Sequence, residues 1–214
     1  MKTKIILYDD NEALGNSIKL MIEEEDDLEV TAFFAGAQTV IEDIRVLKPD
    51  VVLMDIDMPD VNGVEAVTKI RKLNKQIPVI MLTVFDDNEN IFNAICAGAS
   101  GYILKRSATE EIPNAIRNVL TGGAPMTGSV ARKLLQMISV NEKTKEVFDI
   151  TQHEKMVLQL LVKGYSYKMI AAELTVSIDA VRFHIKKIYD KLHVHSATEA
   201  VFKALKNKLV SIFL

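Results

Sequence analysis

The first half of the chain alternates between two hydrophobic periods. Short apolar runs rich in branched side chains are separated by longer stretches in which apolar residues recur every three or four positions. The short runs predict strands at residues 4–8, 29–34, 50–55, 78–83 and 101–104. The longer stretches predict helices at about residues 11–26, 36–47, 63–74, 86–98 and 108–121. Five βα units in series predict a doubly wound α/β fold, in which a parallel sheet carries helices on both faces.

The βα alternation ends at Gly122-Gly123, and from Thr151 the pattern is purely helical. Residues 127–138 predict a connecting helix, the polar segment 139–150 predicts a linker, and four short helices follow from Thr151. Thr151 and Ser196 each begin a capping box, because a glutamate follows three residues later. We therefore predict an α/β domain at residues 1–122, a connecting helix and linker at 123–150, and a small all-α domain at 151–214.

Charge divides the chain in the same way. Residues 1–122 carry 12 Lys and Arg against 21 Asp and Glu, a net charge of −9, whereas residues 123–214 carry 14 against 8, a net charge of +6. An acidic domain joined to a basic one indicates different partners, and the basic domain is a candidate for nucleic acid. The single cysteine excludes an internal disulfide, and no apolar run is long enough to span a membrane. The N-terminus lacks the pattern of a secretory signal, so we expect a cytoplasmic protein without a membrane partner.

Five polar residues come directly at the carboxyl ends of predicted strands: Asp9, Asp10, Asp55, Thr83 and Lys105. Because the ends of parallel strands meet at one edge of the sheet, we expect these side chains to converge. Neighbouring carboxylates repel each other unless a cation neutralises them, and oxygen ligands beside a phosphoryl group favour Mg²⁺. One carboxylate can then attack phosphorus, while the metal, the lysine and the hydroxyl stabilise the transferring group.

The fragments IILYDDN, MDIDMPDVNG, MLTVFDD and AGASGYILK, in this order, resemble the receiver domain of two-component response regulators. The resemblance implies a flavodoxin-like, five-stranded parallel sheet in which Asp55 is the phosphoacceptor of a sensor histidine kinase. It also implies that Asp10 and Asp55 bind Mg²⁺ through their side chains. The backbone carbonyl of Asp57 would be a further ligand, and Asp9 would act through the metal's waters.

The same resemblance implies three residues that stabilise the phosphoryl group or report on it. Two of them hold its oxygens, and the third is an aromatic switch that turns inward: Thr83, Lys105 and Tyr102 respectively. The chain departs from the family pattern beside this site, because Val84 and Phe85 replace a small and a polar residue. Both narrow the access of an attacking water, so we hypothesise a long-lived phosphorylated form. Asp57 adds an acid that opposes phosphorylation, which leaves the net effect on lifetime open.

The basic domain contains one helix with two different faces. Residues 151–214 carry ten Lys and Arg against five Asp and Glu, a net charge of +5. Ser177 caps the third predicted helix of this domain, whose inner face is apolar. The outer face presents Arg182, Phe183, Lys186 and Lys187. A helix with a packed inner stripe and a cationic outer face suits the major groove of double-stranded DNA.

Residues 148–204, above all AAELTVSIDAVRFHIKKIYDKL and SATEAV, resemble the LuxR-type helix-turn-helix, with the recognition helix at 178–191. The resemblance implies that Arg182, Phe183 and Lys186 contact bases or backbone, and that Lys168 and Thr198 contact phosphates. Lys187 shares the outer face and joins the predicted DNA contacts. Phe183 is bulkier than usual at its position. It could pack on a thymine methyl group or belong to a domain interface, and the sequence does not choose between these.

Together the two halves resemble a response regulator of the NarL/FixJ type, which is not an enzyme. The predicted function is phosphorylation-controlled DNA binding and transcription, with a homodimer as the active form. One alternative is a haloacid-dehalogenase phosphatase, because Asp55-Ile-Asp57 matches its Asp-x-Asp motif. That motif belongs on a first strand, however, and here it follows two complete βα units. A second alternative is a regulator that ignores phosphate, against which the complete acidic pocket argues.

Overall fold

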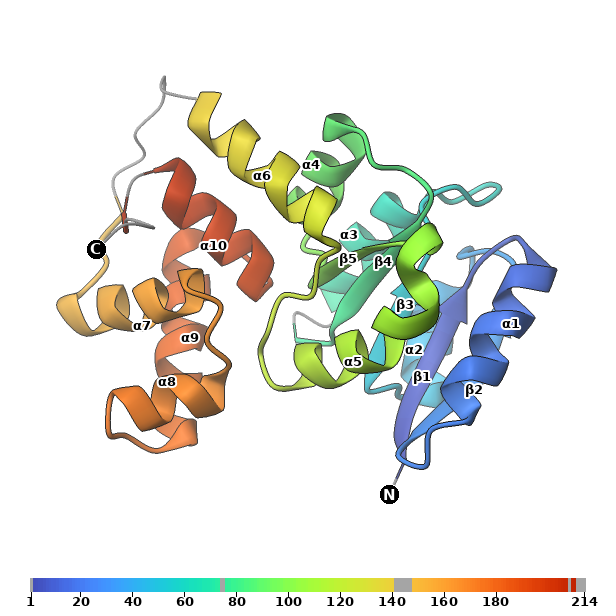
Figure 1. Cartoon of the computed structure of the whole chain (residues 1–214), viewed down its shortest axis with the longest axis horizontal. Helices are drawn as coiled ribbons and strands as arrows, with labels where there is room; N and C mark the ends of the chain where they lie inside the picture. Colours follow the sequence, from blue (N-terminus) through green and yellow to red (C-terminus); the bar gives the residue numbers. More distant parts are fainter. Residues whose placement is uncertain (1, 74–75, 141–147, 208, 211–214) are drawn as a thin grey trace.

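A five-stranded sheet forms the centre of the N-terminal domain (Figure 1). The computed structural model describes residues 2–73, 76–140, 148–207 and 209–210. The strands are β1 (Thr3–Tyr8), β2 (Leu28–Phe34), β3 (Val51–Met54), β4 (Val79–Thr83) and β5 (Gly101–Leu104). Their order is β2-β1-β3-β4-β5, and every neighbouring pair is parallel. The predicted doubly wound fold is confirmed.

Helices cover both faces of this sheet. Successive side chains of a strand point to opposite faces, and both sets are apolar here, so both faces have to be covered. The helices are α1 (Glu12–Glu23), α2 (Val40–Leu47), α3 (Gly63–Leu73), α4 (Asn88–Cys96) and α5 (Ala108–Leu120), the last preceded by a 3₁₀ turn at Lys105–Ser107. Ile5 and Leu7 of β1 pack with α1 and α5, whereas Ile6 and Tyr8 pack with α2, α3 and α4. Strands buried on both faces in this way explain the nearly continuous apolar runs in the sequence.

Strand register determines which polar residues meet at the carboxyl edge. Tyr8 pairs with Met54, so the residues that follow them, Asp9 and Asp55, emerge side by side. The Asp55 amide donates a hydrogen bond to the Tyr8 carbonyl at 2.9 Å, which fixes the end of β3 against β1. On the other side of the sheet, Thr83 of β4 pairs with Leu104, the last residue of β5.

The segment that leaves the sheet differs from the predicted pattern. Tyr102 of β5 donates its backbone N–H to the Pro125 carbonyl and accepts the Thr127 N–H, at 2.9 and 3.1 Å. Residues 125–127 therefore satisfy backbone groups along the outer edge of β5 before helix α6 (Gly128–Val140) begins. That helix extends past its predicted end at 138. Most of the predicted linker, residues 141–147, lies outside the described residues, and the boundaries at 122 and 150 stay predictions.

The C-terminal domain is a bundle of short helices, as the periodicity predicted. These are α7 (Gln152–Val162), α8 (Tyr167–Glu173), α9 (Ile178–Leu192) and α10 (Ala197–Lys206). Their core includes Leu158, Ile170, Ile185 and Ile188, all buried. The capping box at Thr151 is complete. At Ser196 only half of it forms, because the Glu199 carboxylate accepts the N–H of residue 195 instead of the Ser196 N–H.

Candidate functional site

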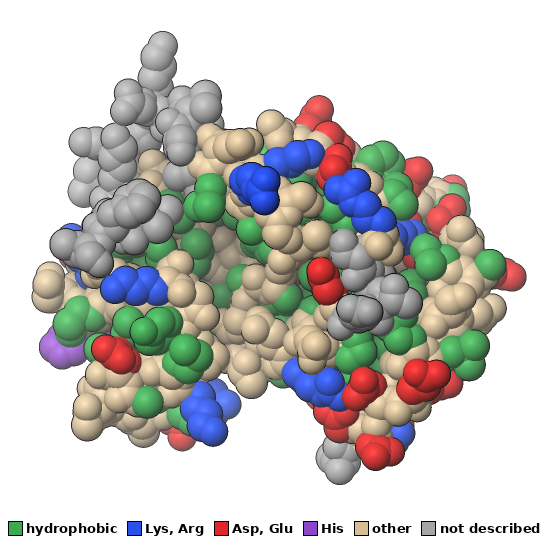
Figure 2. Space-filling view, viewed as in Figure 1, with side chains coloured by type: hydrophobic (Ala, Val, Ile, Leu, Met, Phe, Trp, Pro, Cys, Tyr) green, Lys and Arg blue, Asp and Glu red, His purple; other side chains and the backbone are tan. Residues whose placement is uncertain are grey.

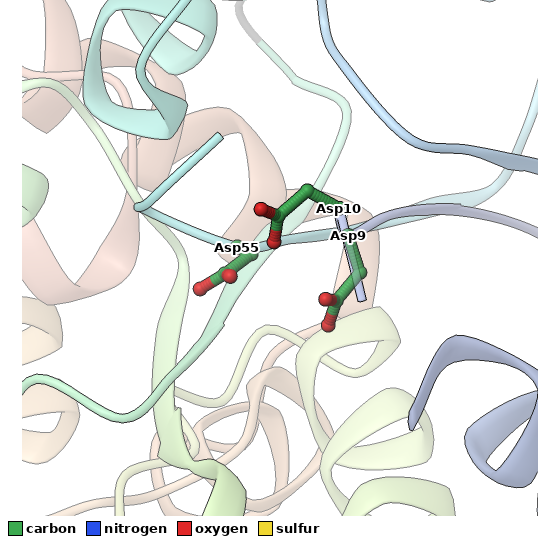
Figure 3. Close-up of side chains that lie close together, drawn as sticks. All are labelled: Asp9, Asp10 and Asp55. Atoms are coloured by element: carbon green, nitrogen blue, oxygen red, sulfur yellow. The ribbon is translucent and has the colours of Figure 1, made fainter. Parts of the chain in front are cut away.

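The predicted acidic residues meet at the carboxyl edge of the sheet (Figure 3). Side-chain oxygens of Asp9, Asp10 and Asp55 lie within 4.8 Å of one another. Asp9 and Asp55 are buried, whereas Asp10 is exposed at the mouth of the pocket. The Lys105 ammonium lies 2.8 Å from Asp9 Oδ2 and 2.8 Å from Asp55 Oδ2. Asp9, Asp10, Asp55 and Lys105, four of the five predicted residues, therefore lie close together at this edge.

Burial and charge pull the titration of this pocket in opposite directions. Burial raises the pKa of the Asp55 carboxyl, the Lys105 ammonium lowers it, and the neighbouring charge of Asp9 raises it further; the net shift is upward. Burial lowers the pKa of Lys105, but the hydrogen bonds and charges of Asp55 and Asp9 outweigh that effect and raise it. One ammonium faces three carboxylates, so the pocket retains excess negative charge that suits a divalent cation.

Thr83 and Tyr102 both contact the loop after β4. Thr83 is fully buried, and its Oγ1 accepts a hydrogen bond from the Phe85 amide at 3.3 Å. The Tyr102 ring is buried, and its hydroxyl donates to the Phe85 carbonyl at 2.9 Å. Burial raises the pKa of Tyr102, which keeps the hydroxyl a donor. Val84 is 69% exposed and Phe85 is half-buried, so of the two only Val84 stands openly on the surface.

Gly63 supports the site through its backbone, a role that the sequence pattern did not indicate. A Cβ at this position would lie 1.8 Å from the backbone oxygen of Asp55. The Gly63 amide also donates to the Ile56 carbonyl at 2.9 Å. The start of α3 thus packs directly on the backbone that carries Asp55, which only glycine permits. The NG pair in the sequence signals a turn but not this approach.

In the C-terminal domain, α8 and α9 form the predicted helix-turn-helix. Ser177 caps α9 by accepting the Ala180 amide at 3.1 Å, and the inner face of α9 is buried. All but one of the side chains predicted to contact DNA are exposed on α8 and α9. The exposed ones are Lys168, Arg182, Phe183, Lys186 and Lys187. Figure 2 shows acidic side chains gathered mainly over the α/β domain, with few over the helical domain. The face shown thus reflects the acidic composition of the α/β domain.

Thr198 lies at the interface between the two domains. Its side chain is 1% exposed, and its hydroxyl donates to the Ser100 carbonyl at 2.8 Å. The Ser196 hydroxyl donates to the Ala99 carbonyl at 2.9 Å while it caps α10. In this conformation Thr198 is out of reach of a DNA phosphate, contrary to its predicted role. A phosphate contact by Thr198 requires the domains to separate.

A buried arginine shapes the turn that receives α10. Arg71 is 3% exposed and donates to the carbonyls of Gly98 and Ile77 at 2.9 and 2.7 Å. Its third contact is the Ser100 hydroxyl at 3.3 Å. Burial lowers the pKa of Arg71 to about 10, so the guanidinium stays charged at neutral pH. Arg71 thus holds residues 98–100 in place. The Ala99 and Ser100 carbonyls of this turn accept the hydrogen bonds from Ser196 and Thr198.

Aromatic packing extends the same interface. Phe92 of α4 and Phe202 of α10 meet edge to face, with ring centroids 5.7 Å apart. Phe202 is 5% exposed and belongs to the hydrophobic core of the α/β domain. Figure 1 shows α10 lying between its own bundle and the region of α4 and α6. We call the contacts of Ser196, Thr198 and Phe202 with the α/β domain the α10 interface.

The recognition helix α9 faces a groove beside the α10 interface. This groove encloses about 420 Å³, and Arg182 and Lys186 line it together with Leu120 and Pro78 of the α/β domain. For base edges to reach Arg182 and Lys186, α9 must lie in the major groove of a duplex. In the observed arrangement, which we call closed, residues of the α/β domain form the opposite wall of that space. The closed arrangement therefore limits access to one flank of α9.

Comparison with known proteins identifies both domains. Residues 5–117 match the family described as response regulator receiver domain, and residues 149–204 match bacterial regulatory proteins, luxR family. The response regulator protein VraR of Staphylococcus aureus (strain Mu3) is 34% identical over 211 residues, which cover 98% of this chain and all of the relative. VraR of Staphylococcus epidermidis matches over the same extent at the same identity.

Solved structures agree with this assignment. The response regulator ChrA of a heme-sensing two-component system aligns with a TM-score of 0.55 at 28% identity, covering 98% of this chain and 99% of its own. A structure of RcsB dimers bound to DNA aligns with a TM-score of 0.60 at 23% identity, covering 97% and 99%, which shows a shared fold. Among the described residues, each helix is too short or too polar to cross a bilayer.

The chain belongs to the response regulators that combine a receiver domain with a LuxR-type DNA-binding domain. It is thus a DNA-binding regulator of a two-component system. This membership separates it from the haloacid-dehalogenase phosphatases. The chain shares their short Asp-x-Asp motif, but the motif does not lie on the first strand here.

Proposed function

We propose that Asp55 accepts a phosphoryl group from a sensor histidine kinase and that this modification controls DNA binding. The observation that carries the proposal is the convergence of Asp55 with Asp9, Asp10 and Lys105 at the carboxyl edge of the sheet. An oxygen of Asp55 attacks phosphorus, the bond to the kinase histidine breaks, and an acyl phosphate remains. Lys105 supplies a positive charge for the phosphoryl oxygens, and the Thr83 hydroxyl supplies a hydrogen-bond donor.

The carboxylates fit a magnesium ion by charge and by ligand chemistry. Asp10 and Asp55 would bind it through side chains, the backbone carbonyl of Asp57 would be a further ligand, and Asp9 would act through bound water. The Asp57 side chain is exposed, which agrees with a carbonyl rather than a carboxylate role. When bound, Mg²⁺ neutralises the charge that builds up between carboxylate and phosphoryl group. The protein's part is to hold the two carboxylates and Lys105 in fixed positions.

The closed arrangement is the proposed low-affinity form. It buries Thr198 and turns Arg182 and Lys186 toward the receiver domain. The loop after β4 links the pocket to this interface, because Phe85 contacts both Thr83 and Tyr102 and α4 follows directly. Phosphorylation that moves Thr83 toward the phosphoryl group would shift this loop and weaken the packing of α4 against α10. The population of separated domains would then rise.

Separated domains would free Thr198 and remove the wall that the α/β domain forms beside Arg182 and Lys186, so that double-stranded DNA could approach α9. Arg182 and Lys186 would reach guanine edges or phosphates, and Lys168, Lys187 and Thr198 would contact the backbone. A homodimer would place two α9 helices on two half-sites. RcsB, which shares the fold, has been described as dimers bound to DNA. A regulator of this kind acts where the chromosome lies, so we place it in the cytoplasm. It changes state by a single stoichiometric modification rather than by turnover, so it is not an enzyme.

Mass spectrometry after incubation with acetyl phosphate and MgCl₂ tests the central step. We expect one labile phosphoryl adduct, located at Asp55, that is absent from Asp55→Ala and depends on magnesium. Continuous hydrolysis of a phosphomonoester, or a stable adduct elsewhere in the chain, would contradict the proposal.

A further inference from the structure

The connecting helix α6 begins at the strand that leads to one of the pocket residues. Thr127, directly before the helix, is buried, and its hydroxyl accepts the Leu104 amide at 3.0 Å. The Thr127 carbonyl accepts the Val130 amide at 2.9 Å, which closes the first turn of α6. Lys105, which reaches Asp55 at 2.8 Å, follows Leu104 directly in the chain. The start of α6 is therefore fixed to the end of β5, beside the pocket.

A second attachment joins the body of α6 to the loop after β4. The Lys133 ammonium donates to the backbone carbonyl of Asp86 and lies 3.3 Å from the Asp86 carboxylate. Arg106 meets the same carboxylate at 3.0 Å. Lys133, and to a smaller extent Arg106, lower the pKa of Asp86, so this carboxylate is charged at neutral pH. We call the contact between Lys133 and Asp86 the α6 clasp; Asp86 lies three residues after Thr83.

Helix α6 also packs against both sides of the α10 interface. Val130 and Leu134 are buried in the hydrophobic core that contains Ile91 of α4 and Phe202 of α10. Helix α6 contacts α4 and α10 directly, and Figure 1 shows it above both of them. A shift of α6 against the receiver domain would therefore disturb the packing that receives α10.

The two attachments of α6 respond differently to a phosphoryl group at Asp55. Thr83 would draw the loop that carries Asp86 toward the pocket, whereas Thr127 keeps the start of α6 on β5. Both attachments cannot persist when the two strand ends move relative to each other. The clasp is the weaker one, because the Lys133 and Asp86 side chains are 32% and 39% exposed, whereas Thr127 is buried.

We infer that the α6 clasp is an autoinhibitory contact, which holds α6 in the closed arrangement and opens when Asp55 is phosphorylated. The inference rests on the proposed function and deepens it. It adds the connecting helix as a second route from the pocket to the α10 interface, besides the packing of α4. Lys133 is then a positioning residue, since it acts on DNA binding only through the placement of α6.

Hydrogen exchange of the full chain, followed by mass spectrometry, tests the holding role of the clasp. Lys133→Gln removes the cation, and Arg132→Gln is the matched control, because it makes the same change of charge at the neighbouring, exposed position of α6. Without activation, residues 128–137 and α10 should exchange about two- to fivefold faster in Lys133→Gln than in the control, the effect of one partly exposed ion pair. Adding Asp86→Asn to Lys133→Gln should bring no further increase, because both changes remove the same contact.

Activation with beryllofluoride and Mg²⁺ tests the opening of the clasp. It should speed exchange of α6 in the wild type and in Arg132→Gln, and much less in Lys133→Gln, whose clasp is already open. The inference is overturned if Lys133→Gln exchanges like the control, or if activation has the same effect in all three proteins, as it would with a purely structural ion pair. Failure of the proposed function looks different. Beryllofluoride would then change exchange in none of the proteins, which removes the opening step, while a faster exchange of Lys133→Gln without activation would still support the holding role.

Discussion

Removing the Phe92 ring should open the closed arrangement without any change to the phosphorylation pocket or to the DNA-binding surface. Phe92 lies on the receiver side of the α10 interface, where it meets Phe202 edge to face. Truncation of a fully buried phenylalanine costs about 3–5 kcal/mol. Phe92 is only half-buried, so we assign about 1–2 kcal/mol of its packing to the domain interface.

That magnitude translates directly into DNA affinity. If only the separated form binds DNA, the apparent dissociation constant is inversely proportional to the open fraction, so it falls as that fraction rises. Because 1.4 kcal/mol corresponds to a factor of ten, Phe92→Ala should bind DNA about 5- to 30-fold more tightly than wild type without phosphorylation. The activated proteins should bind equally well, since both are then largely open. Fluorescence anisotropy with a selected duplex, with and without beryllofluoride, provides the assay.

Two further variants make this test decisive. Leu20→Ala removes an apolar side chain that is 65% exposed on α1, outside the α10 interface, and should leave both affinities unchanged. The double variant of Phe92 and Phe202 should be no more open than the more open single variant, because both changes remove the same contact. Unchanged DNA affinity of a folded, unphosphorylated Phe92→Ala protein would refute the assignment of this interface as the inhibitory one.

Other predictions concern the pocket and its surroundings. Burial raises the pKa of Asp55, so the wild type loses stability as pH rises above the ordinary aspartate range. Without Mg²⁺, Asp55→Asn should therefore be more stable than the wild type at pH 7. Below pH ~4 this difference in stability should disappear, because Asp55 is then protonated. Urea unfolding measures this, and Mg²⁺ should stabilise the wild type more than the variant. Gly63→Ala should destabilise the receiver domain by about 2 kcal/mol or more, because its Cβ meets the Asp55 carbonyl, whereas Gly128→Ala, with open space around it, should change stability by at most ~1 kcal/mol. Val84→Ala should speed loss of the phosphoryl group, followed by mass spectrometry over time; equal or slower decay would remove the idea that this side chain shields the site.

The pocket was predictable because its parts share one signal. Asp9, Asp55, Thr83 and Lys105 each follow an apolar run, and parallel topology alone brings such positions together. The roles of Gly63 were not predictable, because a close backbone approach depends on how α3 settles on β3. The same Asn-Gly pair in a turn without this close contact would have given the same sequence pattern.

The α10 interface was missed for a different reason. Its acceptors are the backbone carbonyls of Ala99 and Ser100, which every sequence supplies, so no side-chain pattern indicates them. Its donors, Ser196 and Thr198, already had local explanations as a helix cap and as a phosphate contact. The short hydroxyl side chains suit all of these partners, and only the tertiary arrangement selects one.

The most direct test of the account compares the DNA affinity of the full chain before and after activation with beryllofluoride and Mg²⁺, in wild type and in Asp55→Ala. We expect activation to tighten wild-type binding by a factor between about 5 and 150, the usual range of coupling between two sites in one protein. Asp55→Ala should show no change, because its pocket cannot bind the phosphoryl mimic. Equal wild-type affinities with and without activation would contradict the claim that the pocket controls DNA binding.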